Sequence, residues 1–390
     1  MISVETALDQ LFALVSPGAV EEVPLAEAHQ RVLARSVTTS LTQPPFAASA
    51  MDGYAVAASR VAPGARFRVI GEAAAGHGFD GLVAEDYAVR IFTGAPLPEG
   101  TDRVVIQEDV TRESDIITLK DALDEAPYVR PAGADFEAGM RLDAPRLLGP
   151  SDIALLAAMN IARVPVVARP KVALLATGDE LVMPGETPGP DQIIASNSFG
   201  LKALVESLGA TARLLPIARD NEASLRMAFE LAADADLIVT IGGASVGDHD
   251  LVGPVAETMG LQRSFYKIGM RPGKPLMAGR MGDAAMLGLP GNPVSAMVCG
   301  HVFLAPVIRT MLGLPARAAP RYQAQLGADL AANGPREHYM RAILDGDTIT
   351  AQPRQDSALL SVLAASNTLL IRPVGDGPRR AGETVDYIPL

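Results

Sequence analysis

The sequence predicts an α/β protein made of several domains, and three observations lead to this fold class. The chain has 390 residues, more than one hydrophobic core normally serves, so two to four domains are expected. Apolar strands and helices alternate regularly from residue 171 to about residue 312. Short apolar stretches separated by Pro and Gly fill residues 43–140 and the segment after residue 317, and this texture is typical of β-rich parts.

The composition argues against some classes of binding partner and indicates the cellular compartment. Lys and Arg number 33 against 45 Asp and Glu, a formal net charge of −12, which argues against binding nucleic acid through many phosphate contacts. The one cysteine, Cys299, excludes an internal disulfide and a multi-cysteine metal site. The N-terminus carries Glu and Asp in place of a basic segment, and no run of about 20 apolar residues occurs. We therefore expect a cytoplasmic protein that does not bind membranes.

The first 168 residues combine helices with a β-rich segment. Residues 4–15 place apolar side chains at helical spacing after a potential N-cap, Ser3. Between residues 43 and 140, four short apolar stretches alternate with Pro/Gly turns, so we expect a β-rich insert there. A second helix is expected to begin at Pro150 and Ser151.

The region from Lys171 to about Leu312 reads as alternating strands and helices. The strands are almost continuously apolar, which is typical of a parallel sheet covered by helices on both faces. The expected strands are 171–178, 211–220, 236–243, 262–269 and 284–291, and the expected helices are 196–209, 221–235, 251–259 and 293–312.

The last 70 or so residues have a β texture again, after a proline-rich joint. Residues 338–353 predict a hairpin that turns at Asp345 and Gly346. Residues 367–374 and 384–390 add two further strands. We expect a small C-terminal β-barrel.

Three polar loops rich in Gly and Pro follow apolar strands of the α/β region, at residues 177–180, 241–250 and 290–293. Ligands of parallel α/β sheets bind outside the carboxyl ends of the strands, so these loops are expected to line one crevice. Glycine allows close approach of a ligand, and a following helix N-terminus favours an anion. A single loop of this kind is as often a plain tight turn; three together, each with Asp, Ser or Asn, favour a binding site.

A cluster of cations lies between the last two of these loops. Lys267, Arg271 and Lys274 fall within eight residues, on a backbone stiffened by two prolines. The segment is not a phosphate-binding P-loop, because Pro275 follows Lys274 where that motif needs Ser or Thr. A solvated basic turn is the alternative, but prolines reduce the flexibility that such turns show. The cluster therefore favours binding of a phosphate or another oxyanion.

Carboxylates stand opposite this cluster. Glu180, Asp220, Asp248 and Asp250 all follow strands of the α/β region. Mg²⁺ is commonly held by one or two carboxylates, water and substrate phosphates, so this combination suits a Mg²⁺–phosphate or oxyanion site. Taken singly, any of these acids is more often a turn or capping residue.

A serine hydrolase is one alternative, because residues 243–247 match the pattern G-x-S-x-G. A nucleophile elbow needs a sharp turn from strand to helix at the serine. Here residues 247–250 intervene before the next helix, so the loop is too long for an elbow. Ser245 is therefore interpreted as a loop hydroxyl that faces a ligand.

Six motifs in this chain together closely resemble those of the molybdopterin molybdenumtransferases, a family that includes the E domain of gephyrin. Each motif is weak alone, but the six occur in order along the whole chain. They are Ser49–Ala55, Thr93–Pro98, Thr177–Leu181, Gly242–Gly247, Arg271–Pro275 and Leu289–Ser295.

The resemblance implies a fold and an activity. It implies an elongated helical domain (residues 1–42 plus 139–168) interrupted by a β-rich insert (43–138), a three-layer molybdopterin-binding α/β domain (169–316) and a C-terminal β-barrel (317–390). Members are homodimers with the active site between subunits. They insert molybdate into adenylylated molybdopterin, release AMP and need Mg²⁺. The molybdopterin adenylyltransferase is a further implied partner.

The resemblance also implies roles for particular residues. Asp52 and Thr93, from the insert, would face the crevice of the partner subunit. Glu180, Asp220 and Asp250 would be the functional acids around Mg²⁺ and the adenylate phosphate. The implied ligand-binding residues are Ser245, Lys267, Arg271, Lys274, Pro290, Pro293, Arg341 and Ser357. Arg271 stands where many members have Lys, which keeps the charge but replaces a compact ammonium with a flat guanidinium.

Two other functions fit part of this pattern. The adenylyltransferase that acts one step earlier shares the α/β fold, but enzymes of that type lack the β insert and the barrel. A non-catalytic scaffold or paralogue would bind the pterin or a partner without turnover. Such a protein does not need Asp52, Glu180, Asp220, Asp250 and the cation cluster. The sequence therefore favours the enzyme that inserts molybdate.

Overall fold

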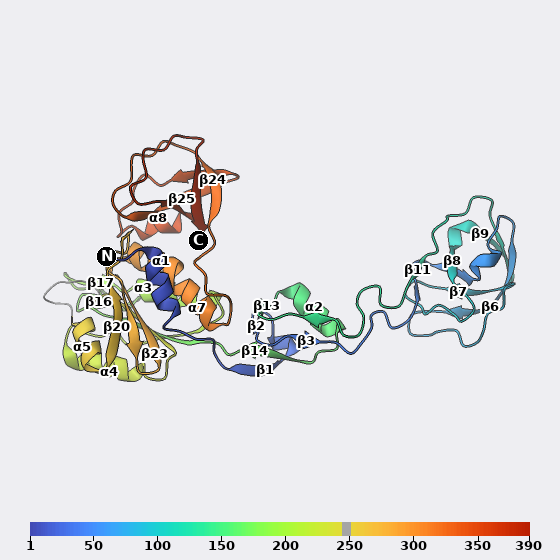
Figure 1. Cartoon of the computed structure of the whole chain (residues 1–390), viewed down its shortest axis with the longest axis horizontal. Helices are drawn as coiled ribbons and strands as arrows, with labels where there is room; N and C mark the ends of the chain where they lie inside the picture. Colours follow the sequence, from blue (N-terminus) through green and yellow to red (C-terminus); the bar gives the residue numbers. More distant parts are fainter. Residues whose placement is uncertain (244–250) are drawn as a thin grey trace.

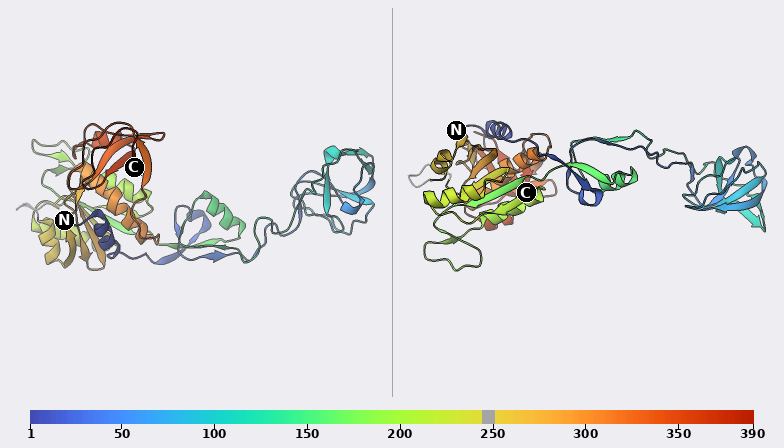
Figure 2. Two further views of the ribbon diagram at one scale, coloured as in Figure 1. Left: turned by 45° about the horizontal axis from the view of Figure 1, so that its top comes forward. Right: turned by 90° about the horizontal axis from the view of Figure 1, so that it is seen from below.

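The computed structural model describes residues 1–243 and 251–390 and shows an elongated molecule (Figure 1). An α/β unit and a C-terminal barrel are stacked at one end, a small unit forms the middle, and the β-rich insert lies at the far end. The two further views show that the insert is joined to the middle unit only by two adjacent chain segments (Figure 2). The predicted multidomain α/β architecture is therefore confirmed.

The α/β unit is built on a six-stranded sheet with the order β18-β15-β19-β23-β22-β20. The first four strands of this order run parallel, as predicted, but β22 is antiparallel to both of its neighbours. The sheet is thus mixed, and the expectation of a wholly parallel sheet was wrong at this edge. The strands are β15 (Lys171–Ala176), β18 (Thr211–Leu214), β19 (Leu237–Ile241), β20 (Leu261–Tyr266), β22 (Met277–Met281) and β23 (Ala284–Leu289).

Helices cover both faces of this sheet, which confirms the three-layer arrangement. Two separate apolar cores lie on the two faces, because nearly every side chain of the central strands is buried. One face packs against α1 (Val4–Phe12), α3 (Asn197–Ser207), α6 (Pro293–Cys299) and α7 (Ala305–Met311). The other face packs against α4 (Glu222–Leu231) and α5 (Val252–Thr258).

Helix α1 lies in a different unit from the one predicted. It begins after Ser3, whose side chain accepts a hydrogen bond from the Thr6 backbone N–H. Its buried residues, among them Leu8 and Leu11, join the core of the α/β unit and not that of the middle unit. The helical spacing showed that one face is buried, but not against which unit.

The last helical segment of the α/β unit is interrupted. A π-helical turn, η4 (Gly300–Leu304), separates α6 from α7, where the sequence predicted one continuous helix. Pro306, at the start of α7, has no N–H to donate to the preceding turn, which explains a break in the regular hydrogen bonding there. The segment Pro293–Met311 is long and apolar enough to cross a membrane, but 83 % of its most apolar part is buried inside the protein.

The middle unit pairs one helix with a small sheet. Helix α2 (Pro150–Ala158) begins where predicted, with Pro150 at its first position and Asp152 accepting from the Gly149 N–H. The sheet has the order β1-β14-β2-β13, which the sequence pattern did not predict. Its strands are β1 (Val20–Pro24), β2 (Val32–Leu33), β13 (Arg146–Leu147) and β14 (Arg163–Val167), and β3 (Val37–Thr38) pairs with β12 (Arg141–Leu142) nearby.

The insert is β-rich, as predicted. Its sheet has the order β8-β5-β7-β6-β10-β9 and encloses two small apolar cores. The strands are β5 (Gly53–Val56), β6 (Arg66–Ala73), β7 (Tyr87–Ile91), β8 (Arg103–Ile106), β9 (Val110–Glu113) and β10 (Ile116–Leu119), with β4 (Ala48–Ser49) paired to β11 (Val129–Arg130) at its base.

The C-terminal unit is a closed five-stranded barrel. The sheet order β25-β26-β24-β28-β27 closes because β27 also pairs with β25. The predicted turn at Asp345 and Gly346 joins β25 to β26. The strands are β24 (Tyr322–Leu326), β25 (Glu337–Asp345), β26 (Thr348–Ala351), β27 (Thr368–Arg372) and β28 (Thr384–Pro389), and α8 (Leu360–Ala364) precedes β27. A short strand of the α/β unit, β21 (Met270–Arg271), adds in parallel to β25 and so links the two units.

A candidate ligand crevice at the carboxyl end of the sheet

A crevice of about 790 Å³ opens at the carboxyl end of the parallel strands, a volume typical of small-molecule sites. The three loops that the sequence singled out line it together, as predicted, with Glu180, Pro290 and Pro293 on its wall. For the loop after β19 this holds for its described part, up to Gly243. The lining comprises residues 176–178, 180–181, 193–198, 241–243 and 290–293, together with Asp220, Pro275 and Ala358.

Two glycines allow the loops to approach one another at the floor of this crevice. Gly242 and Gly243 have φ angles of +97° and +60°, a region that residues with a side chain rarely adopt. A Cβ on Gly242 would lie 2.7 Å from the Thr177 carbonyl oxygen, and one on Gly243 would lie 2.2 Å from a methyl group of Val252. Only glycine therefore permits this turn, which brings the first two loops into contact.

The acidic side of the crevice carries two of the three predicted acids. Glu180 and Asp220 both line it and both are exposed to solvent. The Asp220 N–H donates to Asp179 Oδ1 at 3.2 Å, so the loops that carry Glu180 and Asp220 are held together. The third acid, Asp250, and the hydroxyl residue Ser245 lie outside the described residues.

Several further contacts shape this crevice, and the sequence pattern gave no role to Arg219 or Asn197. Arg219 donates to the carbonyl oxygens of Asp179 and Leu181 at 2.9 and 3.2 Å and so fixes the loop that carries Glu180. Asn197 Nδ2 donates to the Gly291 carbonyl at 2.7 Å, which ties α3 to the third loop. The buried Thr177 hydroxyl finds no hydrogen-bond partner among the described residues. The sequence pointed to Arg219 and Asn197 only in that they lie near the predicted loops and acids.

The cation loop connects β20 to β22 beside the crevice. The backbone folds back on itself, since Lys267 and Ile268 donate to the carbonyls of Leu276 and Lys274. Gly273 packs so tightly on the helix behind it that a Cβ would lie 2.4 Å from Cys299 Sγ. Burial raises the pKa of the Cys299 thiol, so this side chain packs as a small apolar residue. Of this loop, Pro275 lines the crevice, while Lys267, Arg271 and Lys274 do not.

The barrel contributes a fully buried arginine at this junction. Arg341 is 0 % exposed, and its Nη2 donates to the Asp356 carbonyl at 2.9 Å. Its Nε and Nη1 have no hydrogen-bond partner in the described parts of the chain. Burial and the nearby Arg271 lower the pKa of the Arg341 guanidinium, against the opposing effect of Asp356. Buried donors without partners are rare in proteins, so these two Arg341 donors are available to a ligand.

His338 extends this positively charged junction. It stands opposite Arg271 in the pairing of β25 with β21. Burial, followed by Arg271, Arg341, Arg372 and Arg336, lowers the pKa of His338 to about 4, so the imidazole is neutral at pH 7.

Ser357 lies where the barrel meets the crevice. Its carbonyl oxygen accepts from the Val294 N–H at 2.9 Å, at the start of α6, and the next residue, Ala358, lines the crevice. Arg341 and Ser357 are thus joined to the crevice through the segment from Asp356 to Ala358, and Arg271 lies in the strand that pairs with β25 beside them.

Asp52 and Thr93 form the predicted pair, but away from the crevice. Asp52 Oδ1 accepts from both the backbone N–H and the hydroxyl of Thr93, each at 2.8 Å. These two hydrogen bonds, opposed by partial burial and assisted by Arg90, lower the pKa of the Asp52 carboxyl. Both residues belong to the insert, which the middle unit separates from the crevice of the same chain (Figure 1).

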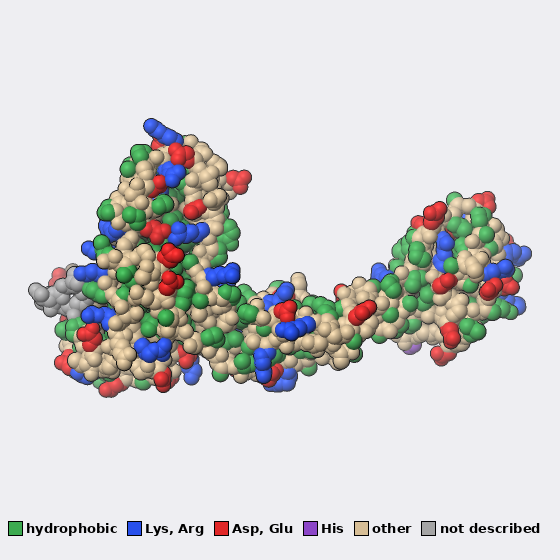
Figure 3. Space-filling model, viewed as in Figure 1, with side chains coloured by type: hydrophobic (Ala, Val, Ile, Leu, Met, Phe, Trp, Pro, Cys, Tyr) green, Lys and Arg blue, Asp and Glu red, His purple; other side chains and the backbone are tan. Residues whose placement is uncertain are grey.

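On the face of the molecule drawn in Figure 3, Lys and Arg are interspersed with Asp and Glu and form no broad basic area. Within residues 1–243 and 251–390, no group of three or more His, Cys, Asp or Glu side chains is arranged to hold a metal ion. Mg²⁺ needs only one or two carboxylates when phosphate oxygens and water complete its shell, so Glu180 and Asp220 fit that donor set.

Comparisons with known proteins cover the whole chain. Residues 2–160 match the MoeA N-terminal region (domain I and II), residues 173–310 a probable molybdopterin binding domain, and residues 323–390 the MoeA C-terminal region (domain IV). A molybdopterin molybdenumtransferase of Haemophilus influenzae is 36 % identical over 100 % of this chain and 99 % of its own length. A molybdopterin molybdenumtransferase of a Nostoc species is 35 % identical over 100 % of this chain and 94 % of its own length.

A solved structure agrees with these sequence matches. The molybdopterin biosynthesis MoeA protein of Pyrococcus horikoshii covers 100 % of both chains with a TM-score of 0.87 and 27 % identity. The match extends over the insert, the middle unit, the α/β unit and the barrel, so it includes every part that the six motifs span. The chain therefore belongs to the molybdopterin molybdenumtransferase family, whose members are transferases of molybdenum cofactor biosynthesis.

Proposed function

We propose that this enzyme inserts molybdate into adenylylated molybdopterin and releases AMP, with Mg²⁺ as its metal cofactor. The observation that carries the proposal is an acidic edge on the crevice together with a buried arginine beside it that has two donors without partners in the described chain. Glu180 and Asp220 line the crevice, and Arg341 of the barrel is bonded to the Asp356 carbonyl, two residues before the crevice residue Ala358. A substrate that carries a phosphoanhydride and receives an oxyanion needs both kinds of group.

The acidic edge is the place for the metal-bound phosphates. Glu180 and Asp220 would hold Mg²⁺ in company with substrate oxygens and water, and Asp250 is the third acid proposed for this group. Bound there, Mg²⁺ would neutralise charge on the phosphates as AMP leaves. Arg219 and Asp179 keep the two carboxylate loops in position for this role.

The junction between the two units is the place for molybdate. Arg341 offers Nε and Nη1, both without partners in the described part of the chain, and these can donate to an anionic oxygen. Arg271, Lys274 and Ser357 complete the proposed contacts, with Lys267 on the phosphate side and Ser245, Pro290 and Pro293 along the crevice wall.

We further propose that the enzyme acts as a homodimer in which Asp52 and Thr93 serve the crevice of the partner subunit. The insert lies too far along the molecule to reach its own crevice (Figure 1). Two hydrogen bonds from Thr93 orient the half-buried Asp52 carboxyl and lower its pKa. The molybdopterin adenylyltransferase is a candidate partner for delivery of the substrate, and the proposed location is cytoplasmic.

The proposed activity is tested by supplying adenylylated molybdopterin, molybdate and Mg²⁺ and measuring the finished cofactor through activation of a cofactor-free molybdoenzyme. We expect activation that depends on all three. A protein that binds the adenylylated pterin tightly but yields no cofactor would be a binding paralogue.

Mixing two inactive variants tests the shared site. Asp52→Asn and Asp220→Asn homodimers are each expected to lose at least about 100-fold in turnover, since each lacks one charged group of the site. If Asp52 serves the partner's crevice, an exchanged heterodimer has one intact site and one doubly altered site. Co-expressed and tag-purified heterodimers should therefore recover about half of the wild-type turnover per dimer. Recovery no greater than that of the parents would place Asp52 outside the partner's site.

A further inference from the structure

A second cavity of about 400 Å³ lies beside the crevice. It forms between the start of α3, helix α6 with the turn that follows it, α8 of the barrel and the C-terminal residue. Ser196 and Asn197 line both the crevice and this second cavity, so only the start of α3 separates the two spaces. Its volume falls within the range of about 300–1,000 Å³ that small-molecule sites occupy.

The walls of the second cavity are suited to a neutral ring. Met297, Leu360 and Leu363 supply apolar surface. Ser366 and Asn197 use their side chains to donate to protein carbonyls, and Ser196 contacts Asn197 at 3.3 Å. His301 has no hydrogen-bond partner among residues 1–243 and 251–390, and burial lowers the pKa of its imidazole. A neutral imidazole can donate from one nitrogen and accept at the other, so it fits a ring edge with both donors and acceptors.

The position of the second cavity relates it to the oxyanion end of the crevice. Arg341 donates to the carbonyl of Asp356, Ala358 lines the crevice, and Leu360 lines the second cavity. One short turn of the barrel therefore runs from the proposed molybdate site to the second cavity. Glu180 and Asp220 line only the crevice.

We propose that the second cavity binds the pterin ring system of the substrate; this assignment rests on the function proposed above. The dithiolene that receives the metal is attached to the pterin end, so the pterin has to lie next to the oxyanion contacts. The phosphates and adenosine then extend through the crevice toward Glu180 and Asp220. A flat neutral ring with amino and carbonyl groups on its edge matches the apolar walls and the single free imidazole.

Two tryptophan variants at the end of α8 test this assignment, one at its last residue and one at the residue that follows. Ala364 lines the second cavity and is exposed, and its neighbour Ala365 is also exposed but does not line it. Ala364→Trp should fill the cavity, while Ala365→Trp adds the same bulk outside it. Fluorescence titration with free pterin should show saturable binding to the wild type, at least about tenfold weaker binding to Ala364→Trp, and wild-type binding to Ala365→Trp. AMP should bind all three proteins equally.

A third variant and a competition experiment complete the test. His301→Leu should weaken pterin binding and raise the KM for adenylylated molybdopterin with little change in kcat, because it removes contacts made equally in ground and transition states. Pterin and AMP should bind together. Competition between them, or wild-type pterin binding by Ala364→Trp, would overturn the assignment. If instead the wild type yields no cofactor, the proposed function fails whatever the pterin titration gives.

Discussion

Replacement of Arg341 with methionine is expected to lower molybdate-dependent turnover by about 100-fold or more while changing the free energy of unfolding by no more than about 1 kcal/mol. The loss of turnover follows because a preorganised, charged donor in a buried site would be removed from the anion. Stability should change little because Arg341 is already under-satisfied. The substitution removes the hydrogen bonds from Arg341 to the carbonyls of Asp356 and Arg354. It also removes Nε and Nη1, two buried donors that have no partner in the described chain.

The combination of a large catalytic effect with a small effect on stability distinguishes a ligand-binding arginine from a structural one. A buried structural arginine, once removed, normally destabilises the fold through lost hydrogen bonds. Turnover and urea-induced unfolding should be measured on the same preparations. Arg380→Met is the matched control, since Arg380 lies on the same barrel in an exposed ion pair with Asp329. That variant should keep both quantities near wild type, and near-wild-type turnover of Arg341→Met would remove Arg341 from the site.

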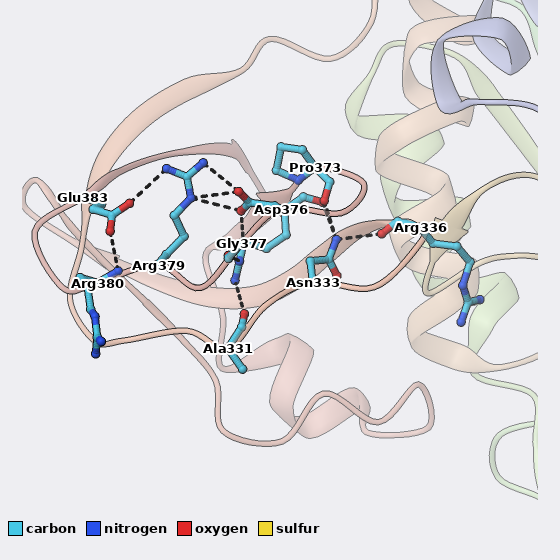
Figure 4. A network of polar contacts seen from close by, with 10 residues as sticks. Ala331, Asn333, Arg336, Pro373, Asp376, Gly377, Arg379, Arg380 and Glu383 are labelled. Carbon is cyan, nitrogen blue, oxygen red and sulfur yellow. Dashed lines mark hydrogen bonds and ion pairs between the residues drawn. The ribbon is translucent and has the colours of Figure 1, made fainter.

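Replacement of Asp376 with alanine is expected to destabilise the barrel by about 3–5 kcal/mol, the typical cost of leaving one partner of a buried ion pair uncompensated. Asp376 accepts from Arg372 and from Arg379 in the network drawn in Figure 4. The Arg372 side chain is only 2 % exposed and the Asp376 side chain 10 %. The other Arg372 donors bond to the carbonyls of Ala331 and Gly377, so no second carboxylate replaces Asp376.

The stabilisation by Asp376 should depend on pH in a defined direction. Burial alone would raise the pKa of Asp376, but the hydrogen bonds from Arg379 and Arg372 outweigh it and the pKa is lowered. A lowered pKa in the folded state means that the contribution is complete above the unfolded-state pKa of about 3.9 and is lost as the pH falls through the folded-state value. The wild type should therefore lose its advantage over Asp376→Ala as the pH falls below about 4.

Urea unfolding of both proteins at several pH values measures this dependence. Asp329→Ala serves as the control, because its ion pair with Arg380 is mostly exposed and should contribute no more than about 1 kcal/mol. A difference between wild type and Asp376→Ala that stays constant from pH 7 to pH 3 would contradict the role of the charged carboxylate.

The sequence was most informative where local patterns determine the structure. The runs of apolar residues from Lys171 to Leu289 indicated the buried strands, and Asn221 or Pro293 indicated helix starts. Strand β22 was missed because Met277–Met281 contains Gly, Arg and no β-branched residue, so neither propensity nor alternation signals a strand. The sequence also could not predict which unit α1 packs against, since an amphipathic stripe shows that a face is buried but not which core buries it.

The site could be predicted in part for a similar reason. The carboxyl-end rule for parallel sheets placed the loops of Glu180 and Pro290 on one crevice without any knowledge of side-chain positions. The approach of Arg341 and Ser357 depends on how the barrel docks on the α/β unit, so only the family resemblance pointed to them. Arg219 and Asn197 act by fixing loops through single hydrogen bonds, for which the sequence holds no recognisable pattern.

The central claim is that molybdate insertion and AMP release are coupled at one composite crevice. A single-turnover reaction tests it most directly, with enzyme in excess over adenylylated molybdopterin, Mg²⁺ present and molybdate added or omitted. AMP released and molybdenum bound to the pterin are measured together. The account predicts that both appear with molybdate in equal amounts and at the same rate, and that neither appears in Arg341→Met. AMP release at the same rate without molybdate, or molybdenum transfer without AMP release, would contradict it.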